Sequence, residues 1–166
     1  MTAPSERLAS HLASHDVARV LYGATVGLAL VIAFQDHPPT AAVATALIAA
    51  TALAIGFAEL YSEAVSAEAS TRHPVRRPEL RRMTRDAAAV VLGAGFPAVY
   101  FLLAALGAMT SHTAVLLSKW SGLALICGYG YFAARLAGFG TAGAALRAAM
   151  VSLIGVALIG IKALLH

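Results

Sequence analysis

Two glutamates four residues apart, Glu59 and Glu63, are the residues of this sequence whose type and spacing best suit chemistry. Residues at this spacing lie on one face of a helix, and Ser62 and Ser66 lie close to the same face. Two neighbouring carboxylates repel each other, so they favour a proton or a cation between them. Carboxylate and hydroxyl oxygens are ligands of hard or borderline divalent metals. The pair is therefore a candidate metal or proton site.

The position of Glu59 also allows a second interpretation. If the apolar helix begins at Ala41, Glu59 is its nineteenth residue. A rise of about 1.5 Å per residue then places it roughly 27 Å along, at the inner end of a bilayer core of about 30 Å. There the carboxylate reaches water or pairs with an arginine of the adjacent loop. Both interpretations stay open for Glu59, whereas the salt bridge is favoured for Glu63.

No set of nucleophile, base and acid accompanies the two glutamates. The 6 histidines all fall in predicted tails or loops, and none stands beside a serine or cysteine of an apolar segment. A hydrolase needs such a set within hydrogen-bonding reach. The sequence therefore does not predict an enzyme.

The elements that position the glutamates are predicted to be membrane helices. The 166 residues are 60% hydrophobic and 12% charged, with a mean hydropathy of +0.78, whereas soluble domains carry about 25% charged residues. A helix needs about 20 mostly apolar residues to cross a bilayer. We therefore expect an all-α, polytopic membrane protein with a single membrane domain over residues 1–166. Its five predicted spans are Val17 to Phe34, Ala41 to Tyr61, Ala87 to Met109, Val115 to Arg135, and Ala144 to Leu165.

The basic residues predict the orientation of these spans. Six arginines fall between Arg72 and Arg85, and the net charge is +4. Lys and Arg are retained on the cytoplasmic side of short loops. A cytoplasmic N-terminus, with a tail over residues 1–16 and a basic loop over residues 67–86, places ten basic residues inside and two outside. We expect a multi-pass protein of the cell (inner) membrane that binds no nucleic acid. The loop offers four arginines to anionic lipid or an acidic partner: Arg76, Arg77, Arg81 and Arg82.

Small residues and one proline predict how the spans pack. Gly23 and Gly27 form a small-xxx-small pair in the first span, and Gly155 extends a weaker small-residue face in the fifth. Such residues let helix backbones approach closely, within or between subunits. Pro97 in the third span frees a carbonyl and is expected to bend the helix.

Several segments resemble the vacuolar iron transporter family. They are Leu21 to Gly27, Ala54 to Ser62, Gly93 to Pro97, and the hairpin from Gly128 to Leu165. The resemblance implies five spans, a cytoplasmic N-terminus, a homodimer, and proton-coupled export of ferrous iron or manganese from the cytoplasm. The metal is then the transported ion, and no resident cofactor is expected.

The resemblance carries over to some residues and not to others. Glu59 falls at the glutamate of the family's Gly-Glu-Tyr-Val-Ser motif, and Pro97 at the proline of its third span. Val26 stands where the family has the aspartate of an Asp-Gly pair, and Ile55 where it has a metal-binding methionine. A short arginine-rich loop replaces the cytoplasmic metal-binding insert of many members.

Two functions follow as expectations. The first is a homodimeric transporter that moves a divalent metal cation in exchange for protons, with Glu59 and Glu63 in the site. The second is a non-transporting membrane protein of the same fold, which binds a protein partner or anionic lipid through its arginine-rich loop.

Overall fold

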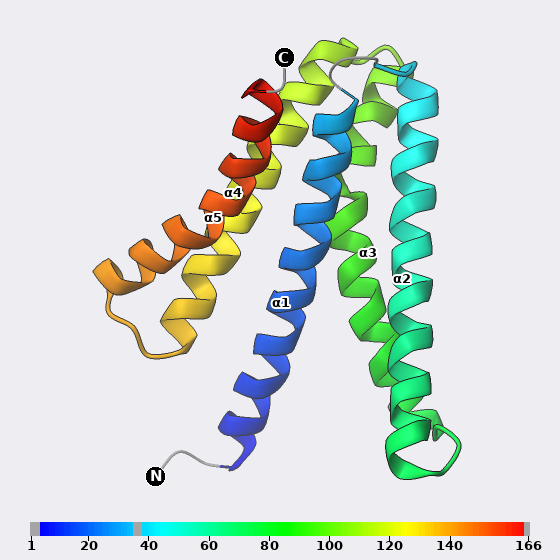
Figure 1. Cartoon of the computed structure of the whole chain (residues 1–166), viewed down its shortest axis with the longest axis vertical. Helices are drawn as coiled ribbons and strands as arrows, with labels where there is room; N and C mark the ends of the chain where they lie inside the picture. Colours follow the sequence, from blue (N-terminus) through cyan, green and yellow to red (C-terminus); the bar gives the residue numbers. More distant parts are fainter. Residues whose placement is uncertain (1–3, 35–37, 165–166) are drawn as a thin grey trace.

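The described part of the chain forms five helices that run alternately up and down (Figure 1). The computed structural model describes the backbone of residues 4–34 and 38–164, and side chains for residues 17–34, 38–150, 152, 153 and 157. No strand occurs in these backbone ranges. The helices are α1 (Pro4–Ala33), α2 (Ala41–Thr71), α3 (Arg77–Ala105), α4 (Ser111–Leu136) and α5 (Thr141–Leu164). The all-helical prediction is confirmed.

Helices α2 and α3 extend well beyond the predicted spans. The basic loop expected over residues 67–86 is helical except at residues 72–76. Pro78 lies in the first turn of α3, where a missing N–H costs nothing, and the Glu79 carboxylate accepts the Arg76 backbone N–H at 3.0 Å. These start signals begin a helix inside the segment that was expected to be a loop. The tail expected over residues 1–16 is likewise largely replaced by helix, since α1 begins at Pro4.

Helices α1 and α3 cross with their backbones in direct contact. A Cβ atom built on Gly23 would lie 2.3 Å from the Val90 carbonyl oxygen, and one on Gly93 would lie 2.4 Å from the Val20 oxygen. Real Cβ contacts are never this short, so only glycine fits on either side of the crossing. Gly27 continues the contact one turn later, against the carbonyl of Ala94.

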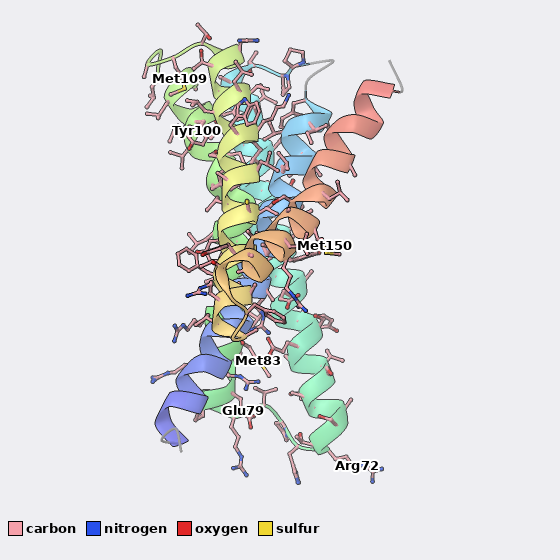
Figure 2. All side chains as sticks on the ribbon, turned by 90° about the vertical axis from the view of Figure 1, so that its left-hand side faces the viewer. Arg72, Glu79, Met83, Tyr100, Met109 and Met150 are labelled. Carbon is pink, nitrogen blue, oxygen red and sulfur yellow. The ribbon has the colours of Figure 1, made fainter. Side chains whose placement is uncertain are left out.

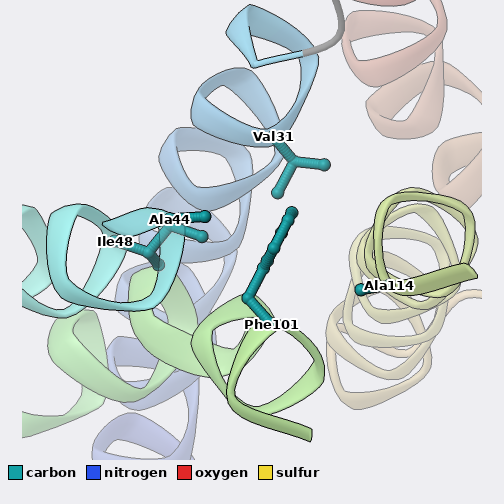
Figure 3. Close-up of a cluster of buried hydrophobic side chains, with 5 residues drawn as sticks. All are labelled: Val31, Ala44, Ile48, Phe101 and Ala114. Carbon is teal, nitrogen blue, oxygen red and sulfur yellow. The ribbon is translucent and has the colours of Figure 1, made fainter. Parts of the chain in front are cut away.

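A small apolar core lies between the first four helices. Figure 3 shows its main cluster, in which the Phe101 ring of α3 lies among Val31, Ala44, Ile48 and Ala114. All five side chains are almost completely buried. A second cluster packs Ala24, Leu28 and Ile32 of α1 against Ile126 of α4. Helix α5 packs mainly on α4, at the side of the molecule away from α2 (Figure 1).

Much of the apolar surface faces outward. Helices α2 and α3 are long and apolar enough to cross a membrane, with mean hydropathies of 2.1 and 2.0 over their best stretches, and only 22% and 33% of those stretches is buried. Large side chains such as Phe57, Tyr61 and Leu92 are about 70% exposed, at 69%, 73% and 73%. The apolar part of α1, Val17–Ala33, is shorter. Membrane association is thus suggested by two helices, and the five-span topology stays a prediction.

The α1–α3 crossing gives a test of the fold. Gly23→Ala forces a methyl group against the backbone of α3 and should destabilise the protein by about 1–3 kcal/mol, as overpacking does elsewhere. Gly128→Ala is the matched control, because nothing lies within 4 Å of a Cβ at Gly128 in α4. Alanine there should stabilise the helix slightly. Thermal unfolding of the purified protein, followed by circular dichroism, measures both. Equal shifts for the two variants would contradict the crossing.

Candidate functional site

One arginine and three carboxylates from three helices converge near one end of the molecule. The Arg19 guanidinium of α1 forms a short ion pair with Asp86 of α3. It also contacts the Glu63 carboxylate, with both oxygens 3.3 Å from Nη2, and its Nε lies 3.6 Å from Glu59 Oε1. We call these four residues the Arg19 cluster. It ties α1, α2 and α3 together.

The helices place each member of the cluster for a local reason. Arg19 lies one turn before Gly23, so the close α1–α3 crossing brings its side chain against α3. Glu59 and Glu63 are four residues apart in α2 and therefore face the same way. Asp86 lies at the point where the basic start of α3 meets its apolar part. The cluster thus forms where polar and apolar segments of all three helices meet.

The four side chains differ in burial, and this difference orders their ion pairs by strength. The side chain of Asp86 is 9% exposed and that of Arg19 is 17% exposed, whereas Glu63 and Glu59 are 22% and 32% exposed. Coulomb attraction is stronger where water is excluded. The Arg19–Asp86 pair is therefore the fixed part of the cluster. The two glutamates are held more loosely and lie closer to water.

The cluster carries a surplus of negative charge. Arg82 is the second cation, with Nη2 3.8 Å from Glu63 Oε1, but its side chain is 65% exposed. The ion pairs given above, all between described side chains, join three carboxylates to two guanidinium groups, one of them largely in solvent. Such a site attracts cations rather than anions.

An open cavity of about 510 Å³ lies beside the glutamates. Its wall includes Arg19, Glu59, Glu63 and Arg82, the buried Met83, and three serines of α2. The serines are Ser62, Ser66 and Ser70. Ser62 and Ser70 donate their hydroxyl protons to backbone carbonyls of α2, which leaves their oxygen lone pairs available as acceptors. The cavity is therefore lined by oxygen atoms along one face of α2.

The structure places Glu59 and Glu63 on one face as the spacing predicts, and it confirms the ion pair favoured for Glu63, whose partners are Arg82 of the predicted loop and Arg19. The arginine that contacts Glu59 comes from α1, not from the adjacent loop. Asp86 was predicted only as the end of the basic loop, and Arg19 only as one of the ten basic residues on the cytoplasmic side. The available signal was that each charge stands at the edge of an apolar segment.

The carboxylates do not form a complete metal site. Within the described side chains, no group of three or more His, Cys, Asp or Glu residues is arranged to hold a metal ion. Val26 and Ile55, at the positions of the missing family ligands, are partly buried and supply no ligand atoms. The chain therefore offers two glutamates and nearby hydroxyls, and water would have to complete any cation shell.

The other predicted residues lie apart from this cluster. Arg76, Arg77 and Arg81 are exposed around the start of α3, at the end of the molecule where Figure 2 labels Arg72 and Glu79. Pro97 is buried inside α3, and the predicted bend there stays a prediction. Gly155 lies in α5, outside the residues whose surroundings are described.

None of the protein families, curated proteins or solved structures compared with this chain matches it. The resemblance to the vacuolar iron transporter family therefore rests on the short segments of the sequence alone.

The difference in burial within the cluster predicts that two amide substitutions will destabilise the protein to different extents. Asp86→Asn removes the most buried partner of Arg19 and should destabilise the protein by about 3 kcal/mol, as expected when a buried ion pair loses one member. Glu59→Gln removes a longer and more exposed contact and should cost about 1 kcal/mol or less. Chemical unfolding of both variants under the same conditions measures the difference. Equal losses, or a larger loss for Glu59→Gln, would show that the ranking is wrong.

Proposed function

We propose that this chain is a multi-pass protein of the cell (inner) membrane, with five spans and a cytoplasmic N-terminus. Two features support the placement. The apolar faces of α2 and α3 point outward, where lipid would satisfy them. The basic residues of the α2–α3 connection and the α4–α5 hairpin, including Arg76, Arg81, Arg135 and Arg147, lie toward the end at which α1 begins. This asymmetry is the pattern of a positive inner side.

Within that membrane protein, we propose that the cavity beside Glu59 and Glu63 exchanges a divalent cation, iron or manganese, for protons. The observation that carries this proposal is the surplus negative charge of the Arg19 cluster beside an open, oxygen-lined cavity. Hydrated divalent ions are commonly held by one or two carboxylates and several waters. Two glutamates and three serines therefore suit a transient site better than a permanent one.

Arg19 gives the exchange a physical basis. A cation that enters between Glu59 and Glu63 competes with the guanidinium, which remains held by Asp86. When the cation leaves, Arg19 or protons neutralise the glutamates again. The carboxylates are thus never left without a counter-charge, which would be costly in a site shielded from water. Asp86 acts as the anchor, and Glu59 is the group most free to change partners.

Transport in liposomes tests this proposal. In proteoliposomes with a proton gradient, the purified protein should move Mn²⁺ or Fe²⁺ in the direction opposite to the protons, which flow down their gradient. Metal-sensitive and pH-sensitive dyes follow the two ions. Glu59→Gln should reduce the flux to the level of protein-free liposomes, because it removes the most accessible carboxylate. Glu68→Gln is the matched control, since it removes the same charge from an exposed position of the same helix. No flux in the wild type, or equal flux in Glu59→Gln, overturns the proposal.

A second candidate function rests on the arginines around the start of α3. Arg76, Arg77 and Arg81 are exposed, and none of them forms an ion pair with a carboxylate in the described part of the chain. Together with Arg82 they form a basic surface beside the proposed inner face of the membrane. Such clusters hold anionic lipid or acidic protein segments by charge. The protein would then act by binding, without transport.

Copurification separates the two candidates. Under the binding function, an anionic lipid or a protein partner should copurify with wild type and with Glu59→Gln. It should be lost when Arg76, Arg77, Arg81 and Arg82 are all changed to Gln. A triple variant that keeps Arg82 isolates the surface from the Glu63 contact and should lose the partner as well. Retention of the partner by the quadruple variant would exclude this function.

A further inference from the structure

A second cavity, remote from the Arg19 cluster, opens between α1, α4 and α5. Its volume is about 800 Å³, within the range of about 300–1,000 Å³ that is usual for ligand sites. Most of its wall is apolar, and residues of all three helices contribute to it. They include Leu21, Tyr129, Ala133, Leu146 and Met150. The function proposed above makes no use of this cavity.

The mouth of the cavity carries positive charge held in place by an aromatic ring. The Arg147 guanidinium carbon lies 3.8 Å from the centroid of the Phe139 ring, and both residues line the cavity. Arg135 donates from Nη1 to the Phe139 carbonyl oxygen at 3.2 Å. Phe139 is positioned by the turn between α4 and α5, in which Gly138 adopts a φ of 86°. Arg147 thus lies over the Phe139 ring in the cavity wall, and Arg135 binds the backbone of the same residue from outside that wall.

Among the described side chains, neither Arg135 nor Arg147 forms an ion pair with a carboxylate. An apolar cavity with a cationic mouth matches a molecule that has an apolar chain and an anionic head. Under the proposed topology this mouth lies at the cytoplasmic surface, where anionic lipids gather. Arginine side chains near the end of a membrane span extend their charged heads toward the membrane–water interface.

We propose that the cavity between α1, α4 and α5 binds one anionic phospholipid, with an acyl chain against the apolar wall and the phosphate on Arg147. Arg135 holds Phe139, and through it the Arg147 side chain, in place. This inference rests on the membrane placement proposed above and not on transport. It differs from binding at the basic surface of α3, because the apolar wall requires the lipid chain as well as its charge.

Native mass spectrometry of the detergent-solubilised protein tests the site with dioleoylphosphatidylglycerol and dioleoylphosphatidylcholine. Wild type should bind the anionic lipid about tenfold more tightly, the factor that one charge-assisted hydrogen bond contributes. Arg147→Gln should abolish this preference. Gly143→Leu should reduce binding of both lipids, because Gly143 lines the cavity and a Cβ there makes only ordinary contacts, at 3.6 Å from the Phe139 side chain. Lys119→Gln, which removes the same charge from a position of α4 outside the cavity wall, should leave the preference intact.

Other results overturn the inference and identify the occupant. If Arg147→Gln keeps the full preference for the anionic lipid, or if Gly143→Leu binds both lipids as wild type does, the lipid does not bind in this cavity. Loss of the preference in Arg81→Gln assigns the lipid to the basic surface of α3. Equal binding of glycerol 3-phosphate indicates a site for free phosphate, and a lipid-free dimer indicates that a second copy covers the cavity. Extraction of the protein from membranes by alkaline carbonate would instead refute the membrane placement itself.

Discussion

The contact between the backbones of α1 and α3 is the constraint on which the rest of the structure depends. With Gly23 on one helix and Gly93 on the other, no side chain separates the two backbones. The distance between the helices is therefore set by main-chain atoms, which cannot change rotamer. One turn away, this fixed distance brings the guanidinium of Arg19 to Asp86. The charged cluster is thus a consequence of apolar packing and not its cause.

The same arrangement explains why four charges can persist at the edge of an apolar bundle. An isolated charge there is costly, and a buried ion pair seldom adds net stability relative to apolar residues of similar size. The Arg19 cluster is therefore expected to add little net stability to the fold, although removing one of its members lowers the stability. The exposure of the carboxylates rises from Asp86 through Glu63 to Glu59, so Asp86 is the member most shielded from water and Glu59 the least. A site that works by exchange needs that gradient.

The sequence predicted the helices well and the charged cluster only in part. Apolar segments of about 20 residues made the all-helical fold and its five elements predictable, and the spacing of Glu59 and Glu63 placed them on one face. The loop over residues 67–86 was predicted too long, because its polar residues include the start of α3, where Pro78 lies in the first turn and Glu79 accepts the Arg76 N–H. Arg19 and Asp86 escaped notice because their meeting depends on the crossing of two helices far apart in the sequence. Periodicity describes one helix at a time and carries no information about which glycines meet.

The short connection between α2 and α3 has a consequence for how the protein acquires its structure. Residues 72–76 join two long helices, so their contacts are local in sequence and close with little loss of chain entropy. The α1–α3 crossing, by contrast, joins segments separated by the whole of α2. We therefore expect the α2–α3 hairpin to form first and α1 to dock onto it afterwards. In that order, the hairpin already holds Arg82 beside Glu63, and Asp86 and Glu59 gain their arginine only when α1 docks.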